Sequence, residues 1–333
     1  MSDIKNILFT FDYELFLGSR SGTVENCVLA PTQKLIEIFT KFSIRNALFF
    51  VDTTYLIQLK KNNSAACKAD YEKITKQLAS LHQQGHYIYP HLHPHWLDAT
   101  YLPDINQWDL SNTKKYSFSS TSLEEREMLF SESFKILEEI CGSQQNLGYR
   151  AGGWCIEPFS DFKPFFKKYN IKYDFSVMKG YSCVSQFQNF DFRSVPNKIF
   201  YSFDDKTISE SKNGEFIEIP ISHIKISLIN RLLNKFFIKL LYRKGITNYG
   251  DGFSTYSASL KEISPYGHEM ASLELLTLTN INDYFSNLHK FSTLHFISHP
   301  KMLNPHNLNC LEVFLKKIVA KYSINTDFKE IVK

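Results

Sequence analysis

The stretch that decides the fold, residues 85–96, reads GHYIYPHLHPHW. Five of the eleven histidines of the chain lie within residues 82–95, and three of them alternate at His91, His93 and His95. In an extended segment, side chains two residues apart point to the same side. The pattern therefore predicts a strand that carries imidazoles on one face. If the chain turns after His91, as Pro94 favours, the side chains of His91 and His95 can still converge on one point.

Imidazole in this pattern indicates a possible metal site. Neutral imidazole binds zinc and related divalent metals, and such a site usually includes a carboxylate and an open water position. The alternative is a set of surface histidines beside a turn. Carboxylates are available, because the apolar run 7–11, typical of a buried parallel strand, ends in Asp12 and Glu14. These two acids are two residues apart and can face the same side; the alternative role for them is a helix cap or a turn.

The rest of the chain alternates predicted strands and helices. Strands are expected at 45–51, in the histidine-rich stretch after residue 85, and at 147–150, 171–176 and 293–300, and helices at 31–42, 71–84, 121–141, 158–168 and 308–322. This order predicts an α/β fold with a parallel sheet and right-handed crossovers. No convincing linker interrupts it, so we expect one domain over 1–333, with insertions around 97–120 and 177–290.

Composition narrows the functional class. The chain has 333 residues, of which 43% are hydrophobic and 22% charged, as in a globular protein. Its six cysteines form no Cys-x-x-Cys pair, which argues against a cysteine metal site and for reduced thiols. With no signal peptide predicted at the N-terminus, we expect a cytoplasmic protein. The net charge of +4, without a basic-aromatic pattern, argues against binding of nucleic acid.

Several chemically capable residues follow predicted strand ends. In a barrel of parallel strands, these ends gather at one rim. Such a set supplies two histidines and a carboxylate as metal ligands, a second carboxylate as a base, and a distant histidine as an acid. The residues concerned are Asp12, Glu14, His91, His95, Arg150, Asp174 and His299.

On these residues the sequence resembles the polysaccharide deacetylase family, whose domain is a distorted (β/α) barrel. The resemblance covers most of the chain and follows the family order of motifs. The blocks are TFDYE at 10–14, GH at 85–86 with His91 and His95, YR at 149–150 with Trp154, YDFS at 173–176, and SHP at 298–300. We therefore expect a distorted (β/α) barrel of the polysaccharide deacetylase type.

The resemblance also implies roles. Asp12 would be the general base, and His91 and His95 would bind a divalent metal, with zinc as the expected ion. Arg150 would pair with Asp12 and orient it. A metal lowers the pKa of a bound water toward neutral pH, so that the base can take its proton. Backbone N–H groups in the turn 152–153 would help to hold the oxyanion.

The remaining roles include one departure from the family. Asp174 would support His299, the general acid that protonates the leaving amine. The family commonly has a second aspartate directly after the base as a metal ligand, and this chain has Tyr13 there. Three alternatives stay open: Glu14 reaches the metal instead, His93 joins the site, or the two histidines bind the metal more weakly with water completing the coordination. We favour His93 as a group that contacts the substrate or supports the site.

The function implied is metal-dependent removal of an N-acetyl group from an amino sugar in a glycan or a lipid-linked glycan precursor. The substrate would contact His93, Trp96 and Trp154. One alternative is another C–N hydrolase on the same scaffold, such as a deformylase. The other alternative is a non-catalytic carbohydrate-binding relative.

The segment 223–244 has an unusual charge pattern. It contains six lysines and arginines and no acid. Four cations at 231, 235, 239 and 243 recur every four residues, and leucines and phenylalanines cover the rest of the predicted helix. The charges exclude a transmembrane span, but a basic amphipathic helix can lie on an anionic membrane, here its inner face. The alternative is an ordinary surface helix packed on the barrel.

Overall fold

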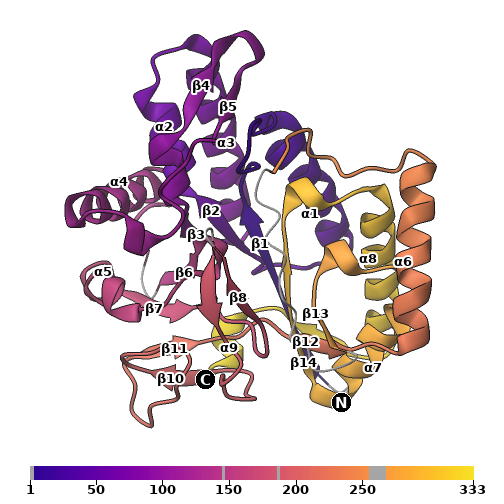
Figure 1. Ribbon diagram of the computed structural model, residues 1–333. Coiled ribbons are helices and arrows are strands. Elements are labelled where there is room, and N and C mark those ends of the chain that lie inside the picture. The colour runs from indigo at the N-terminus through magenta and orange to yellow at the C-terminus, as the bar shows by residue number, and fades with distance from the viewer. Residues whose placement is uncertain (1–3, 145–146, 186–187, 255–267) are drawn as a thin grey trace.

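Parallel strands form the centre of the protein in the computed structural model (Figure 1), which describes residues 4–144, 147–185, 188–254 and 268–333. The main sheet has the order β10-β11-β7-β6-β3-β2-β1-β14, and β15 pairs with the beginning of β1. All of these neighbours are parallel except β10 and β11. The strands are β1 (Ile4–Tyr13), β2 (Leu48–Asp52), β3 (Tyr87–Leu92), β6 (Leu147–Ala151), β7 (Ile171–Asp174), β10 (Tyr201–Phe203), β11 (Phe216–Glu218), β14 (Thr293–Ser298) and β15 (Ser323–Asn325).

Irregular segments close the gap between β11 and β14. The Ser222 N–H donates to the His295 carbonyl of β14 at 3.1 Å, and the Ala271 N–H donates to the Ser222 carbonyl at 2.8 Å. The Ile297 N–H completes the link by donating to the Ala271 carbonyl at 3.0 Å. Single hydrogen bonds thus replace a full strand ladder on this side. The curled, mostly parallel sheet confirms the predicted distorted (β/α) barrel.

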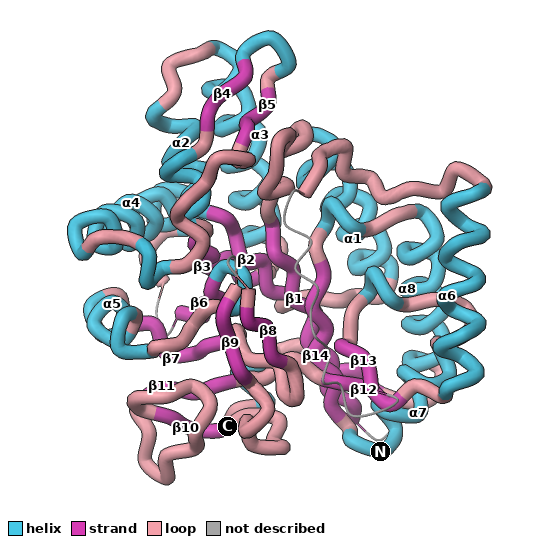
Figure 2. Tube along the Cα trace, viewed as in Figure 1, coloured by secondary structure: helices cyan, strands magenta, loops and turns pink. Residues whose placement is uncertain are grey.

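Helices cover the outside of the sheet and one end of the barrel (Figures 1 and 2). Their apolar faces meet the aromatic side chains of the strands: Phe9 lies 5.0 Å from Phe39 of α1, measured between ring centroids. At the end of the barrel opposite the candidate site, Phe328 of α9 lies 5.3 Å from Phe175. The helices are α1 (Ala30–Lys41), α2 (Thr53–Lys61), α3 (Ala65–Gln83), α4 (Leu123–Cys141), α5 (Lys163–Lys168), α6 (Leu228–Arg243), α7 (Ile281–Phe291), α8 (Pro305–Val319) and α9 (Phe328–Ile331).

Three further antiparallel strand pairs lie outside the main sheet in the described residues (Figure 2); two of them are hairpins, and helix α6 separates the two strands of the third. The predicted insertion 97–120 contains the first of them, and the insertion 177–290 contains the other two together with α6; residues 255–267 lie outside the described residues. The single-domain assignment stays a prediction. The pairs are β4 (Thr100–Leu102) with β5 (Gln107–Asp109), β8 (Ser182–Val184) with β9 (Asn189–Asp191), and β12 (His223–Lys225) with β13 (His268–Met270).

Local signals placed most elements to within a few residues. Helix α4 begins two residues later than predicted, and Ser122 is its N-cap, because its hydroxyl accepts from the Glu125 N–H at 3.2 Å. The Ser122 N–H in turn donates to the Glu125 carboxylate at 3.0 Å, which completes the capping box. Helix α2, six of whose residues are buried, was not predicted. None of the helices in the described ranges has the length and apolar character needed to cross a bilayer.

The aromatic layer between the sheet and helices α7 and α8 generates a first prediction. Phe296 of β14 is fully buried, and its ring lies 5.5 Å from Tyr284 and 5.8 Å from Phe314. Phe296→Ala should lower the free energy of unfolding by about 3–5 kcal/mol, because it removes a buried ring and leaves a cavity. Phe291→Ala, at an exposed position, should change it by less than about 0.5 kcal/mol. Urea denaturation of both variants measures the difference, and equal losses would contradict this account of the core.

Candidate active site

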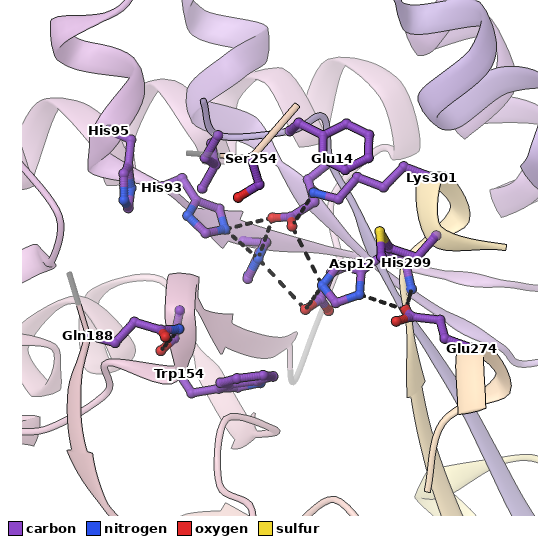
Figure 3. A pocket seen from close by; sticks show the side chains of 15 residues that line it. Asp12, Glu14, His93, His95, Trp154, Gln188, Ser254, Glu274, His299 and Lys301 are labelled. Carbon is purple, nitrogen blue, oxygen red and sulfur yellow. Dashed lines mark hydrogen bonds and ion pairs between the residues drawn. The ribbon is translucent and has the colours of Figure 1, made fainter. Parts of the chain in front are cut away.

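The carboxyl ends of β1, β3 and β14 meet at a cavity of about 330 Å³ (Figure 3). The parallel register brings these ends together, since His91 of β3 pairs with Asp52 of β2 and with Arg150 of β6. The residues that line the cavity are Asp12, Glu14, Phe16, Leu17, His91, His93, His95, Gly153, Trp154, Gln188, Ser254, Glu274, His299, Lys301 and Met302.

Strand alternation at the end of β1 selects which side chains enter the cavity. Asp12 and Glu14 both line it, as their spacing predicts for an extended segment. Tyr13, between them, points to the helix layer, where its hydroxyl donates to the Gln77 side chain of α3 at 2.8 Å. A ligand at the position of Tyr13 would therefore face away from the cavity, whereas Glu14 faces into it.

Glu14, His91 and His93 form a cluster that could hold a metal ion. The Glu14 Oε2 atom lies 2.6 Å from His93 Nε2 and 3.2 Å from His91 Nε2. The two Nε2 atoms are 2.9 Å apart, and the candidate ligand atoms of all three residues lie within 4.8 Å of one another. Two imidazole nitrogens and a carboxylate oxygen are a donor set typical of a catalytic zinc site.

The surroundings of His91 suit a metal ligand. Its Nδ1 atom lies 2.8 Å from the Arg150 carbonyl, to which it donates when protonated, so that the Nε2 lone pair faces the cluster. Such a hydrogen bond to the second nitrogen is the usual way to fix a ligating imidazole. Burial opposes a charge on His91, but the Asp12 and Glu14 carboxylates outweigh it and raise its pKa to about 9. The Asp12 and Glu14 carboxylates thus stabilise positive charge at His91, and a bound divalent cation would supply that charge in place of the imidazole proton.

Lys301 holds the other oxygen of Glu14. Its Nζ atom donates to Glu14 Oε1 at 2.8 Å and to the Leu15 carbonyl at 2.6 Å, and the lysine is almost fully buried. Burial would raise the pKa of Glu14, but the charges of Lys301 and His93 dominate and hold that pKa well below its usual range. Sequence reasoning missed Lys301, because nothing in the local sequence after β14 indicates that it turns toward the end of β1.

The structure brings a different pair of histidines to Glu14 from the pair predicted as metal ligands. His95 lines the cavity but stands outside the network of interactions around Glu14 (Figure 3). His93 takes its place in the cluster, because His91 and His93 alternate on one face while the 3₁₀ turn Pro94–Asp98 carries His95 away. Burial and the neighbouring His93 lower the pKa of His95 to about 3, so it stays neutral, and its ring lies 5.7 Å from Tyr116.

Asp12 and Arg150 form the predicted buried pair. The Arg150 Nη1 atom donates to Asp12 Oδ1 at 2.6 Å, and both side chains are inaccessible or nearly so. Burial would raise the pKa of Asp12, but the charges of Arg150 and two nearby histidines outweigh it and lower the pKa. The free oxygen, Oδ2, faces the cavity, 3.9 Å from His91 Nε2 and 3.6 Å from His299 Nε2. Asp12 is thus an ionised carboxylate with one oxygen available.

The structure also corrects the partner of His299. Its Nδ1 atom lies 2.8 Å from Glu274 Oε1, and the same oxygen accepts from the His299 N–H at 2.6 Å. Burial would lower the pKa of His299, but the Glu274 charge and hydrogen bond outweigh it and raise that pKa. Asp174, which was expected in this role, instead accepts from the Ser176 hydroxyl at 2.8 Å. Glu274 lies in the 3₁₀ turn Leu273–Leu275, inside the predicted insertion, where no sequence pattern marked it.

Of the two tryptophans predicted to contact the substrate, Trp154 lines the cavity and Trp96 does not. Trp154 lines the cavity across from Glu14 and Lys301 (Figure 3), where the 3₁₀ turn Gly152–Trp154 follows β6. Trp96 is fully buried instead: its ring lies 4.5 Å from that of Tyr55, and its indole N–H donates to the Asp52 carboxylate. The prediction that Trp96 contacts the substrate is therefore wrong, since an indole enclosed in the core cannot reach the cavity.

The cluster generates a prediction that separates the two histidines. His93→Ala should abolish stoichiometric zinc binding, because it removes one of the three converging donors. His95→Ala, a matched change two residues away, should retain zinc with an affinity within about tenfold of the unsubstituted protein, as for an outer group. Equilibrium dialysis with each purified variant measures both. The reverse result, with zinc kept by His93→Ala and lost by His95→Ala, would restore the pairing expected from sequence.

Comparison with known proteins supports the fold. No protein-family profile matches the sequence, and no curated protein matches it either. Among solved structures, the chain is similar to a candidate polysaccharide deacetylase from Mycobacterium smegmatis, with a TM-score of 0.51 and 14% identity over 99% of this chain and 89% of that one.

A second similar structure is the catalytic domain of a peptidoglycan N-acetylglucosamine deacetylase from Eubacterium rectale. It has a TM-score of 0.40 and 12% identity over 97% of this chain and 88% of that one. At sequence identities this low, structural similarity supports a shared fold and nothing further. Of the two TM-scores, only the first is high enough to support that shared fold. The chain has the distorted barrel fold of the polysaccharide deacetylases.

Proposed function

We propose that this protein is a metal-dependent hydrolase that removes the N-acetyl group of an amino sugar in a glycan or a lipid-linked glycan precursor. One observation carries the proposal. A single oxygen of Asp12 lies between His91 of the candidate metal cluster, at 3.9 Å, and His299, at 3.6 Å. A base and an acid thus flank one cation site within a single cavity, which is the arrangement that amide hydrolysis requires.

Zinc is the metal we propose, because His91, His93 and Glu14 offer two imidazole nitrogens and one carboxylate oxygen. When bound, a divalent ion would polarise the amide carbonyl and make an adjacent water more acidic. The Nε2 atoms of His91 and His93 lie 2.9 Å apart, and a cation bound to both lone pairs and to Glu14 would offset the repulsion between those lone pairs. Lys301 would keep Glu14 turned toward that centre.

Asp12 and His299 would move the protons. Asp12 would accept a proton from the attacking water at Oδ2, while Arg150 holds Oδ1 and keeps the carboxylate ionised. His299 would donate from Nε2 to the departing nitrogen, and Glu274, at its Nδ1, favours the charged imidazole needed for that step. Proton transfer to nitrogen matters because an amine anion is a poor leaving group.

The lining of the cavity suits a sugar. Trp154 presents an aromatic surface opposite the charged groups, and aromatic rings commonly pack against the apolar faces of ligands. Phe16, Leu17 and Met302 add further apolar contacts around the same space. A cavity of about 330 Å³ lies at the small end of the range for ligand sites and would take one amino-sugar unit with its acetyl group.

Acetate release from N-acetylated amino-sugar oligomers tests the proposal directly. The zinc-loaded protein should release acetate, chelation should stop the reaction, and Asp12→Asn should lower kcat by about a hundredfold or more while zinc stays bound. Asp98→Asn, a matched change outside the cavity lining, serves as the control. Release of formate but not acetate would favour a deformylase, and saturable sugar binding without any turnover would favour a carbohydrate-binding protein.

The corrected partner of His299 generates a separate prediction. Glu274→Gln should lower kcat by at least about tenfold, because the neutral amide no longer stabilises a charged imidazole, and KM should change little. The loss should shrink for substrates with better leaving groups, which depend less on an acid. Asp174→Asn should show no such dependence on the leaving group, and finding one there would restore the role first expected for Asp174.

A further inference from the structure

Polar side chains take part in attaching the first half of helix α6 to the barrel. The Asn230 amide donates to the Asp283 carboxylate of α7 at 2.7 Å, and the buried Asn234 side chain accepts from the Thr277 hydroxyl at 2.5 Å. The inner face of the helix combines these hydrogen bonds with apolar packing further along, where the ring of Phe237 lies 5.1 Å from that of His306 in α8. In Figure 1, α6 stands at the edge of the molecule, outside α8.

Arg231 belongs to this inner attachment. Its guanidinium donates to the Glu269 carboxylate at 3.1 Å and to the His268 carbonyl at 2.8 Å. The sequence placed Arg231 in one cationic stripe with the lysines that follow it. The structure removes it from that stripe, because the helix turns its first basic residue toward β13.

The outer face of α6 is apolar. Ile229, Leu232 and Phe236 expose 71%, 69% and 70% of their surfaces, and Leu233 beside them is also exposed. Their spacing of three and four residues places them in one continuous row along the helix. A helix on a soluble barrel normally turns such a row inward and its polar residues outward. Here the row faces outward, and its side chains form a continuous exposed apolar strip, which is typical of an interaction surface.

Basic residues border this apolar row. Lys235, Lys239, Arg243 and Lys244 are all exposed. No ion pair among the described residues involves them, and the segment 223–244 contains no acidic side chain. The outer face of α6 thus combines an uncovered apolar row with uncompensated positive charge.

We propose that α6 docks this protein on the surface of an anionic phospholipid bilayer. Apolar side chains in one row would enter the boundary between headgroups and acyl chains, while the lysine stems let their ammonium groups stay among the lipid phosphates. A second copy of the chain fits this face less well, because two such helices would bring their uncompensated cations together. The inference is independent of the proposed catalytic activity.

The chain that follows α6 leads directly to the cavity. The Gly250 N–H donates to the Lys301 carbonyl at 2.9 Å, and the Phe253 N–H donates to the Arg20 carbonyl at 2.8 Å. Ser254 then lines the cavity itself. A bilayer bound at α6 would therefore lie beside the segment that continues into the cavity rim.

Vesicle sedimentation tests the docking surface with the full chain. The protein should sediment with vesicles that contain about one third phosphatidylserine and stay in solution with pure phosphatidylcholine. Salt at about 0.5 M should release it, because screening weakens the attraction between the cations and the lipid. The combined variant Lys235→Glu, Lys239→Glu and Arg243→Glu should lower the partition coefficient by at least about a hundredfold.

Two further variants complete the design. Ile229→Ser, Leu232→Ser and Phe236→Ser together should also abolish sedimentation, because the apolar contribution is then lost. Lys68→Glu, Lys73→Glu and Lys76→Glu, all exposed on α3, change the net charge equally and should sediment normally. Circular dichroism should show the fold unchanged in each variant. Failure of the unsubstituted protein to bind anionic vesicles at low salt would overturn the proposal, as would equal losses in the α3 control. A dimer in analytical ultracentrifugation that the α6 variants dissociate would assign the face to a second copy instead.

Discussion

The buried guanidinium of Arg150 is the group on which both the barrel and the candidate site depend. It has no exposed surface, and it donates to Asp12 at 2.6 Å, to the Thr10 hydroxyl at 2.8 Å and to the Phe175 carbonyl at 3.0 Å. It also lies over the ring of Phe50, 4.3 Å from the centroid. One side chain thereby joins β1, β2 and β6 and the residue that follows β7. Because a buried charge is costly unless it is paired, these strands must approach in the one register that satisfies it.

The same cation organises the acids around it. It keeps Asp12 ionised, and its own backbone carbonyl lies 2.8 Å from the Nδ1 atom of His91. Beneath it, Glu218 pairs in register with Asp174, and burial together with the Asp174 charge raises the pKa of Glu218 well above its usual range. Asp174 therefore interacts with the charge of Arg150, whereas the partner of His299 is Glu274.

The ends of β1 and β14 show how an altered ligand position can be accommodated. Tyr13 cannot face the cavity, since strand alternation turns it toward Gln77. Glu14 lies one residue further on, and Lys301 holds one of its oxygens so that the other meets His91 and His93. A long acid held by a dedicated lysine thus reaches the two histidines from the end of β1. The ion pair between Lys301 and Glu14 joins two segments that are 287 residues apart in the sequence.

Local sequence determined the elements and most of the rim. Apolar runs that end in acids or histidines predicted the parallel strands, and the spacing of Asp12 and Glu14 predicted a shared face, because both depend only on residue type and a period of two. Tertiary structure alone decided which groups meet. It places His93 rather than His95 next to Glu14, and Glu274 rather than Asp174 next to His299. It also brings Lys301 to Glu14. These contacts depend on the direction in which the chain turns after each strand, which the local sequence does not show. Tertiary structure also decided that α6 turns its apolar row outward, since a helical period shows that a face exists but not which neighbour covers it.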